Sequence, residues 1–173
     1  MTTALHPEPL HSYRGLPADA ICWDYNAPDT IPDALGGCRF SAGIAEADLL
    51  GPYAYASRVA SGWGAAHKAA VRDTFGRALA VTGIAEFLPN SATHVRLDKT
   101  EKDEHGLPKA QISSGLHTND LIRLRFMRKI ARDVLAAAGA SDILEEYSSY
   151  DVFAATHVFG TCLLYTSPSP RDS

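Results

Sequence analysis

The sequence is poor in the features that mark membrane, disulfide-stapled and nucleotide-binding proteins. No apolar run approaches the ~20 residues that a membrane-spanning helix needs. Cys22, Cys38 and Cys162 are too widely spaced for a zinc or redox motif, so we expect free thiols, no disulfide framework and no metal site. No Gly-x-Gly-x-x-Gly occurs, because Gly62-Trp63-Gly64 is followed by no third glycine at the right step. Residues 1–15 also lack the basic and then apolar stretches of a signal peptide.

Charge and composition narrow the class further. The formal net charge of -4 argues against general attraction to nucleic acid or to an anionic membrane. Apolar residues make up 46% and charged residues 21% of the chain, which is typical of a globular protein rather than a disordered one. A length of 173 residues suffices for one domain.

The first third of the chain is rich in turn-forming residues. Prolines recur through residues 1–35 and no hydrophobic period lasts, so we expect a lead-in of loops and short strands that lie over another part of the fold. We also expect this lead-in to come from a longer chain, with Met1 an internal start. Residues 65–80 then show a helical pattern, weakened near its end by Gly76, and residues 79–85 favour a strand.

A hairpin and a long helix follow. Residues 93–98 alternate polar and apolar side chains, as in a half-buried strand, and residues 109–113 return as a second strand after a charged turn. A helix then begins near Thr118 or Asn119, either of which can cap its first turn, and Gly139 can end it. Its expected buried stripe consists of Leu121, Leu124, Met127, Ala131, Val134 and Ala138. The sequence therefore predicts an α+β fold, in which an antiparallel sheet is covered by helices on one face.

The other face of this helix is rich in arginine. Two interpretations stay open: a phosphate-binding stripe, or a solvated face with ordinary ion pairs, which an acidic chain without interleaved aromatic residues favours. The stripe consists of Arg123, Arg125, Arg128, Lys129 and Arg132.

The end of the chain has a different character. Residues 162–173 show no helical or strand period and finish in a run of serine and proline. The string CLLYTSPSPRD is similar to one reading frame of a transposon adapter used in shotgun sequencing libraries. We therefore expect residues 162–173, Cys162 included, to be a non-native tail, with the genuine protein stopping near Thr161.

A short run just before this tail resembles a known catalytic segment. Residues 157–161, His157-Val158-Phe159-Gly160-Thr161, are similar to the start of the His-x-x-Gly-Thr-Cys-Arg-Met-Gly segment of glucose-methanol-choline oxidoreductases. Further blocks upstream occur in the order expected for bacterial members, so the resemblance covers residues 36–161. Those blocks are Gly62-Trp63-Gly64-Ala65-Ala66-His67-Lys68, Phe75-Gly76-Arg77, Glu86-Phe87-Leu88-Pro89, Val95-Arg96-Leu97-Asp98, Asp103-Glu104-His105-Gly106-Leu107-Pro108 and Ala136-Ala137-Ala138-Gly139-Ala140.

The resemblance implies a truncated C-terminal, substrate-binding domain over residues 36–161. The parent enzyme would be an FAD-dependent dehydrogenase that moves hydride from an alcohol, polyol or sugar CH–OH group to flavin. His157 would be its general base, because the unperturbed histidine pKa of roughly 6.5 lies near operating pH. The electron acceptor would be a quinone, a cytochrome or oxygen. The FAD-binding motif would lie upstream, so no residue here is expected to bind FAD and the fragment alone should be inactive.

Other candidates have simpler explanations. His67 could line a pocket and Glu86 could orient a catalytic group, but a packing histidine and a hydrogen-bonded structural carboxylate are favoured. The remaining histidines, His6, His11, His94, His105 and His117, have no metal-ligand spacing. The rival hypothesis is a non-catalytic helix-hairpin module that binds a protein or nucleic acid through its arginine-rich helix.

Overall fold

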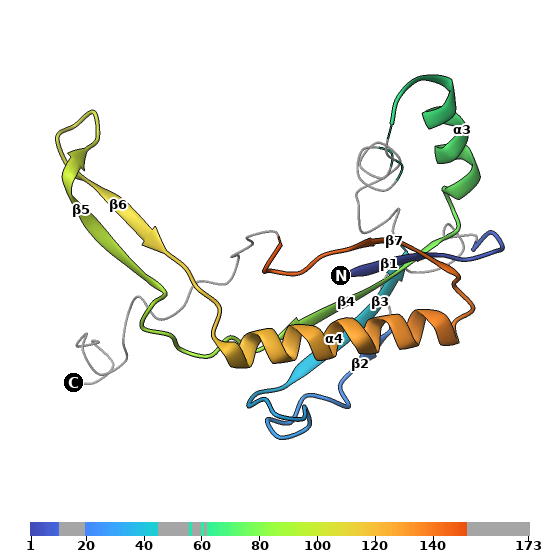
Figure 1. The fold of residues 1–173 in the computed structure, drawn as a ribbon, viewed down its shortest axis with the longest axis horizontal. Coiled ribbons are helices and arrows are strands. Elements are labelled where there is room, and N and C mark those ends of the chain that lie inside the picture. The colour runs from blue at the N-terminus through green and yellow to red at the C-terminus, as the bar shows by residue number, and fades with distance from the viewer. Residues whose placement is uncertain (11–19, 45–55, 57–59, 61, 152–173) are drawn as a thin grey trace, which may run out of the picture.

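The computed structural model describes residues 1–10, 20–44, 56, 60 and 62–151. These residues form an α+β fold with a five-stranded sheet, a separate two-stranded sheet and two helices (Figure 1). The strands are β1 (Thr2–Leu5), β2 (Ile21–Cys22), β3 (Cys38–Ile44), β4 (Ala78–Ala85), β5 (His94–Lys102), β6 (Pro108–Ser113) and β7 (Asp142–Glu146), and the helices are α3 (Gly64–Thr74) and α4 (Thr118–Ala137).

The larger sheet has the order β2-β3-β4-β1-β7, and every neighbouring pair is antiparallel. Its centre is β4, where the small side chains of Ala78 and Ala80 are almost completely buried. β1 lies between β4 and β7, with Thr2 opposite Val81 on one side and opposite Glu146 on the other. The first residues of the chain are therefore part of the sheet and do not lie over it, because Thr2, Thr3 and Ala4 find partners that are distant in sequence.

Helix α4 covers one face of this sheet (Figure 1). Cys38 and Phe40 of β3 and Val81 of β4 share that face and pack against Met127, Ala131 and Leu135 of the helix. Tyr25 joins them, since its ring meets those of Phe40 and Phe126 edge to face at 5.8 and 5.2 Å. The predicted antiparallel sheet is present, but of the two described helices only α4 covers its face, where helices were expected.

The ends of α4 differ from the prediction at one terminus only. The N-cap is His117, whose Nδ1 accepts from the Asn119 amide at 3.2 Å, while the Asp120 carboxylate accepts from the His117 amide at 2.9 Å. Thr118 and Asn119 are thus the first residues of the helix and not its cap. Gly139 ends the helix in the left-handed region (φ 84), as predicted, with the Ala140 amide donating to the Leu135 carbonyl.

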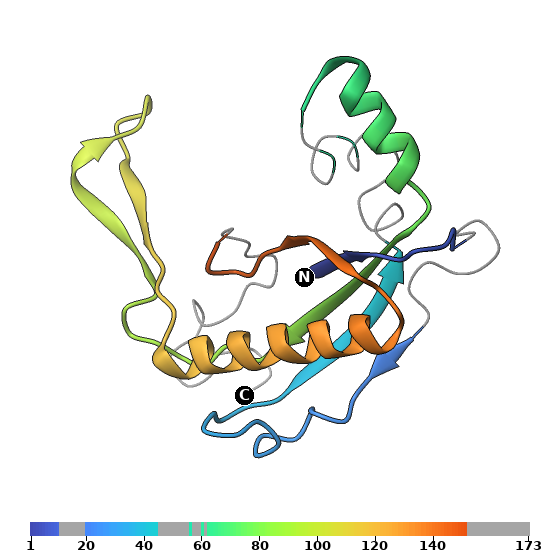
Figure 2. The same cartoon turned by 45° about the vertical axis from the view of Figure 1, so that its right-hand side comes forward.

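Helix α3 is shorter than its pattern indicates. It ends at Thr74, since Gly76 takes a left-handed conformation (φ 84) and β4 begins at Ala78. None of its residues is buried, and it stands at the end of the sheet opposite to the hairpin (Figure 2).

The hairpin of β5 and β6 is confirmed, but its strands are longer and far more exposed than predicted. β5 continues to Lys102, and the turn spans residues 103–107, where Gly106 has φ 79. Val95, Leu97 and Ile112 are 54%, 65% and 70% exposed, so the alternation of β5 does not mark a half-buried strand within the part of the chain that the structure describes.

Candidate functional site

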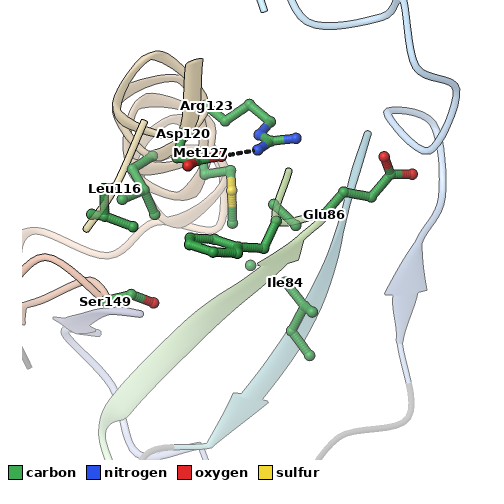
Figure 3. Close-up of a pocket in the computed structure, with 11 residues that line it drawn as sticks. Ile84, Glu86, Leu116, Asp120, Arg123, Met127 and Ser149 are labelled. Carbon is green, nitrogen blue, oxygen red and sulfur yellow. Dashed lines mark hydrogen bonds and ion pairs between the residues drawn. The ribbon is translucent and has the colours of Figure 1, made fainter. Parts of the chain in front are cut away.

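A groove runs between helix α4 and the exposed end of the sheet. Its larger part has a volume of about 640 Å³ and lies beside the turn that follows β7, residues 147–151. A smaller cavity of about 210 Å³ adjoins it (Figure 3). Both are lined by Gly83, Leu124, Met127 and Ser149. The smaller cavity is completed by Ile84, Ala85, Glu86, Phe87, Leu116, Asp120 and Arg123.

The lack of a side chain at Gly83 leaves room for the side chain of Met127, which comes from α4. A Cβ at Gly83 would lie 2.5 Å from Met127 Cε and 3.2 Å from Phe40 Cε1, closer than normal packing allows. Leu121 and Leu124, half-buried residues of the predicted stripe, line the groove above this contact. The groove therefore has an apolar floor formed by one strand and one helix.

One wall of the smaller cavity carries a buried ion pair. Arg123 and Asp120 are 1% and 3% exposed, and the Arg123 guanidinium is paired with the Asp120 carboxylate (Figure 3). Arg123 Nη1 also donates to the Leu35 carbonyl at 2.9 Å, while its buried Nε meets no acceptor in the part of the chain that the structure describes. The Asp120 carboxylate also accepts a hydrogen bond from the His117 amide, at the N-cap of α4.

This pair corrects the predicted helix faces. Arg123 does not belong to a solvated or phosphate-binding stripe, because the buried row of α4 is Asp120, Arg123, Met127, Ala131 and Leu135. Val134 and Ala138, which were expected in the buried stripe, are both exposed, Val134 by 45%. A signal was present in the sequence: Asp120 and Arg123 are three residues apart and in phase with Met127 and Ala131.

The pair also holds the loop before β3. Asn119 donates to the Leu35 carbonyl at 2.8 Å and accepts from the Leu35 amide at 2.7 Å, next to the bond from Arg123. Gly36, at φ 95, lies so close to the Arg123 guanidinium and the Glu86 carboxylate that a Cβ there would clash with both. Glu86 lines the cavity at the end of β4, and both of its predicted roles stay predictions.

The remaining arginine-rich face is engaged in ion pairs. Arg132 donates to both oxygens of Glu146 at 2.8 Å, Arg128 lies 3.8 Å from the same carboxylate, and Lys129 lies 2.6 Å from Asp133. The hydrogen bond from Arg132 is the main reason that the pKa of Glu146 lies below its ordinary value. With Arg123 bound to Asp120, four of the five basic residues have acidic partners. The interpretation as an ordinary, ion-paired face is therefore favoured for the exposed members.

The turn after β7 is well fixed by local hydrogen bonds. The Asp151 carboxylate accepts from the amide and the hydroxyl of Ser148, both at 2.9 Å, and these bonds lower the pKa of Asp151. The Tyr147 amide donates to the Met1 carbonyl at 3.1 Å. The sheet therefore carries the chain to a defined position at Asp151, on the rim of the groove.

The catalytic candidate itself lies beyond this point. His157 and the tail of residues 162–173 fall outside the described residues, so their predicted roles stay predictions. His67 is half-buried on α3, away from the groove, and its buried Nδ1 has no hydrogen-bond partner among the described residues. In the described ranges, no group of three His, Cys, Asp or Glu side chains could hold a metal ion. Nor does either helix have the length and apolar character needed to cross a membrane.

FAD, the cofactor that the resemblance implies, does not fit these residues. A dinucleotide site needs free backbone amides at a helix N-terminus that follows a glycine-rich turn. At α4 those amides are capped by His117, and the Asp120 carboxylate beside them would repel a pyrophosphate. At α3 Gly62 precedes the helix and Gly64 is its first residue, but the third glycine of the motif is missing. The residues that would hold FAD are therefore not among those described.

The chain was compared with protein families and with known proteins. No family model matches the chain. Over 106 residues, 61% of its length, the chain is 28% identical to 2-methyl-1,2-propanediol dehydrogenase from Mycolicibacterium austroafricanum. The chain spans about a fifth of that relative, since the match covers 19% of its length. This similarity to a dehydrogenase supports an oxidoreductase role for the protein to which this chain belongs.

Proposed function

We propose that this chain is the substrate-side part of an FAD-dependent alcohol dehydrogenase of the glucose-methanol-choline family. The observation that carries the proposal is the 106-residue similarity to 2-methyl-1,2-propanediol dehydrogenase. The run from His157 to Thr161, which resembles the family's catalytic segment, supports the same assignment. The substrate class is an alcohol, polyol or sugar, and the relative's name makes a short aliphatic diol the first compound to test.

His157 is the proposed general base of this enzyme. An imidazole suits this task because it can accept the hydroxyl proton of an alcohol near neutral pH, which favours the loss of hydride from the same carbon. In the complete enzyme FAD, held by residues outside the described part of the chain, would supply the hydride acceptor, and a quinone, a cytochrome or oxygen would take the electrons. Asp151, six residues before His157, is held by its hydrogen bonds with Ser148, so the chain leaves the described fold at a defined point.

The rival function, a module that binds nucleic acid or protein through the arginine-rich helix, has weaker support. Binding to phosphates requires cationic side chains that are free to exchange their counterions. On α4 one arginine is buried and three other basic residues are paired with Glu146 or Asp133. The rival still makes its own prediction, which is salt-dependent binding in the absence of flavin.

The complete reading frame tests the proposal. We expect the coding sequence upstream of Met1 to contain a Gly-x-Gly-x-x-Gly segment between a strand and a helix. The complete protein should purify yellow, with one flavin per chain, whereas the 173-residue chain should be colourless. A complete frame without this segment, or a 173-residue chain that binds stoichiometric flavin, would contradict the proposal.

A further inference from the structure

The β5–β6 hairpin carries an apolar strip that no other described element covers. The cross-strand pairs Val95–Ile112 and Leu97–Ala110 lie on one face, because partners in a register share a face. The three large side chains of this strip are between 54% and 70% exposed, and Ala110 is exposed as well. The hairpin projects from the rest of the fold in both views (Figures 1 and 2). An isolated two-stranded sheet is only marginally stable in water, so packing of another surface against this apolar face would stabilise the hairpin.

We infer that the cover is the same strip of a second copy of this chain, so that two hairpins pack face to face. The charges of the hairpin support this occupant. Residues 94–113 contain four basic and four acidic side chains, so the hairpin is neutral, whereas the whole chain has a net charge of -4. A neutral rim with interleaved signs can face a copy of itself without net repulsion, and it offers no charge of one sign to a nucleic acid or an anionic surface.

The shape of the strip also suits a two-fold contact. Three bulky side chains surround one small residue, Ala110, so that a bulky side chain of one copy can pack over Ala110 of the other. A two-fold axis brings the same patch of both copies together, which is the commonest symmetry of soluble oligomers. The aliphatic side chains are removed from water in both copies at once.

The faces of the hairpins are better suited to this contact than their edges. Asp98 Oδ1 accepts from the amides of Thr100 and Glu101 at 2.8 and 2.9 Å. The pairing register of β5 with β6 shifts between Leu97 and Lys102. Such an irregularity bends the strand and interrupts the row of free backbone groups that another strand would need. The opposite face is polar, since Arg96 Nε donates to Gln111 there.

The size of the apolar strip sets the expected affinity of the self-association. A stable dimer buries about 800 Å² on each partner, and a strip of four side chains on a narrow hairpin offers less. The self-association is therefore weak and concentration-dependent, not permanent.

Analytical ultracentrifugation of the 173-residue chain tests this inference. We expect wild-type protein to shift from monomer to dimer between about 10 µM and about 1 mM. Leu97→Lys and Ile112→Lys should each raise the dissociation constant at least about tenfold, because a cation would be buried at the two-fold contact. Leu107→Lys is the matched control, since Leu107 is 62% exposed but lies in the turn, and it should leave the dissociation constant unchanged.

Each contrary outcome has a clear meaning. A wild type that stays monomeric, or strip variants that associate like the wild type, would overturn the inference. Loss of association in Leu107→Lys as well would indicate a general charge effect and would also overturn it. Hydrogen exchange distinguishes a second copy from a lipid bilayer as the occupant. If the chain stays monomeric and its β5–β6 amides gain protection only with neutral phospholipid vesicles, the strip binds a bilayer and the inference is overturned. The inference does not depend on the proposed catalytic function, so either can fail alone.

Discussion

The buried pair of Arg123 and Asp120 allows the sharpest test of the fold. Arg123→Met keeps the apolar stem of the side chain but removes the charge, the bond to Asp120 and the bond to the Leu35 carbonyl. The Asp120 carboxylate, which is 3% exposed, then stays buried without a cationic partner. Breaking a buried pair in this way typically costs about 3–5 kcal/mol. The variant should lose that amount from its free energy of unfolding.

Urea unfolding followed by far-UV circular dichroism measures this loss. With a slope of about 2 kcal/mol per M, the midpoint should fall by about 1.5–2.5 M. Arg125→Met, an exposed arginine on the same helix, is the control and should change the free energy of unfolding by less than about 0.5 kcal/mol. If Arg123→Met behaves like Arg125→Met, Arg123 is on the solvated face after all and its burial is refuted.

A second variant keeps the test informative if Arg123→Met does not fold. Asp120→Asn removes the orphaned charge yet retains an oxygen that can accept from the His117 amide. The double variant Asp120→Asn/Arg123→Met should therefore recover most of the lost stability, since a buried pair replaced as a whole is often close to neutral. A double variant that is less stable than Arg123→Met would contradict the electrostatic explanation.

Three further predictions follow from single contacts. The pKa of Glu146 is lowered in the folded state, so the ionised carboxylate stabilises the fold above the ordinary pKa of 4.5, and this stabilisation is lost as the pH falls through the lower folded pKa. In Glu146→Gln the free energy of unfolding should therefore decline less steeply below about pH 4.5 than in the wild type. Gly139→Ala should cost about 1 kcal/mol in urea unfolding, because φ 84 disfavours a side chain, whereas Ala138→Gly next to it should cost less. Burial raises the pKa of the Cys38 thiol to about 11, so peptide mapping after native alkylation at pH 8 should find Cys38 unmodified, and early modification at Cys38 would contradict its burial.

The sequence predicts those elements whose signals are local. The period of α4, the stop at Gly139 and the alternation of β5 each follow from neighbouring residues, and the structure contains all three elements. The order of the sheet does not follow, because β1 pairs with β4 and β7 through contacts between residues far apart in the chain. Local patterns alone place Thr2–Leu5 in a loop-rich lead-in, although it lies inside the sheet.

The faces of the elements were harder to predict than their presence. Arg123 is an ordinary surface residue by type, and only its pairing with Asp120 and Leu35 makes its burial favourable. The alternation of β5 indicates an apolar face correctly, but it does not reveal that this face is exposed within the described residues. His117 caps α4 through its ring nitrogen, a less common cap than the hydroxyl and carboxamide groups of Thr118 and Asn119. For Arg123 and His117, contacts with residues of other segments or of the following turn decide the outcome, and the residue types alone do not indicate it.

The role of His157 is the central claim, and single-turnover reduction of the flavin tests it most directly. The complete enzyme and its His157→Ala variant, loaded with equal flavin as judged by absorbance, are mixed with a short diol in a stopped-flow instrument. Loss of the proton acceptor should slow flavin reduction by about 10²–10⁴-fold, while flavin content and the thermal midpoint change little. Equal reduction rates in the two proteins would show that His157 is not the general base.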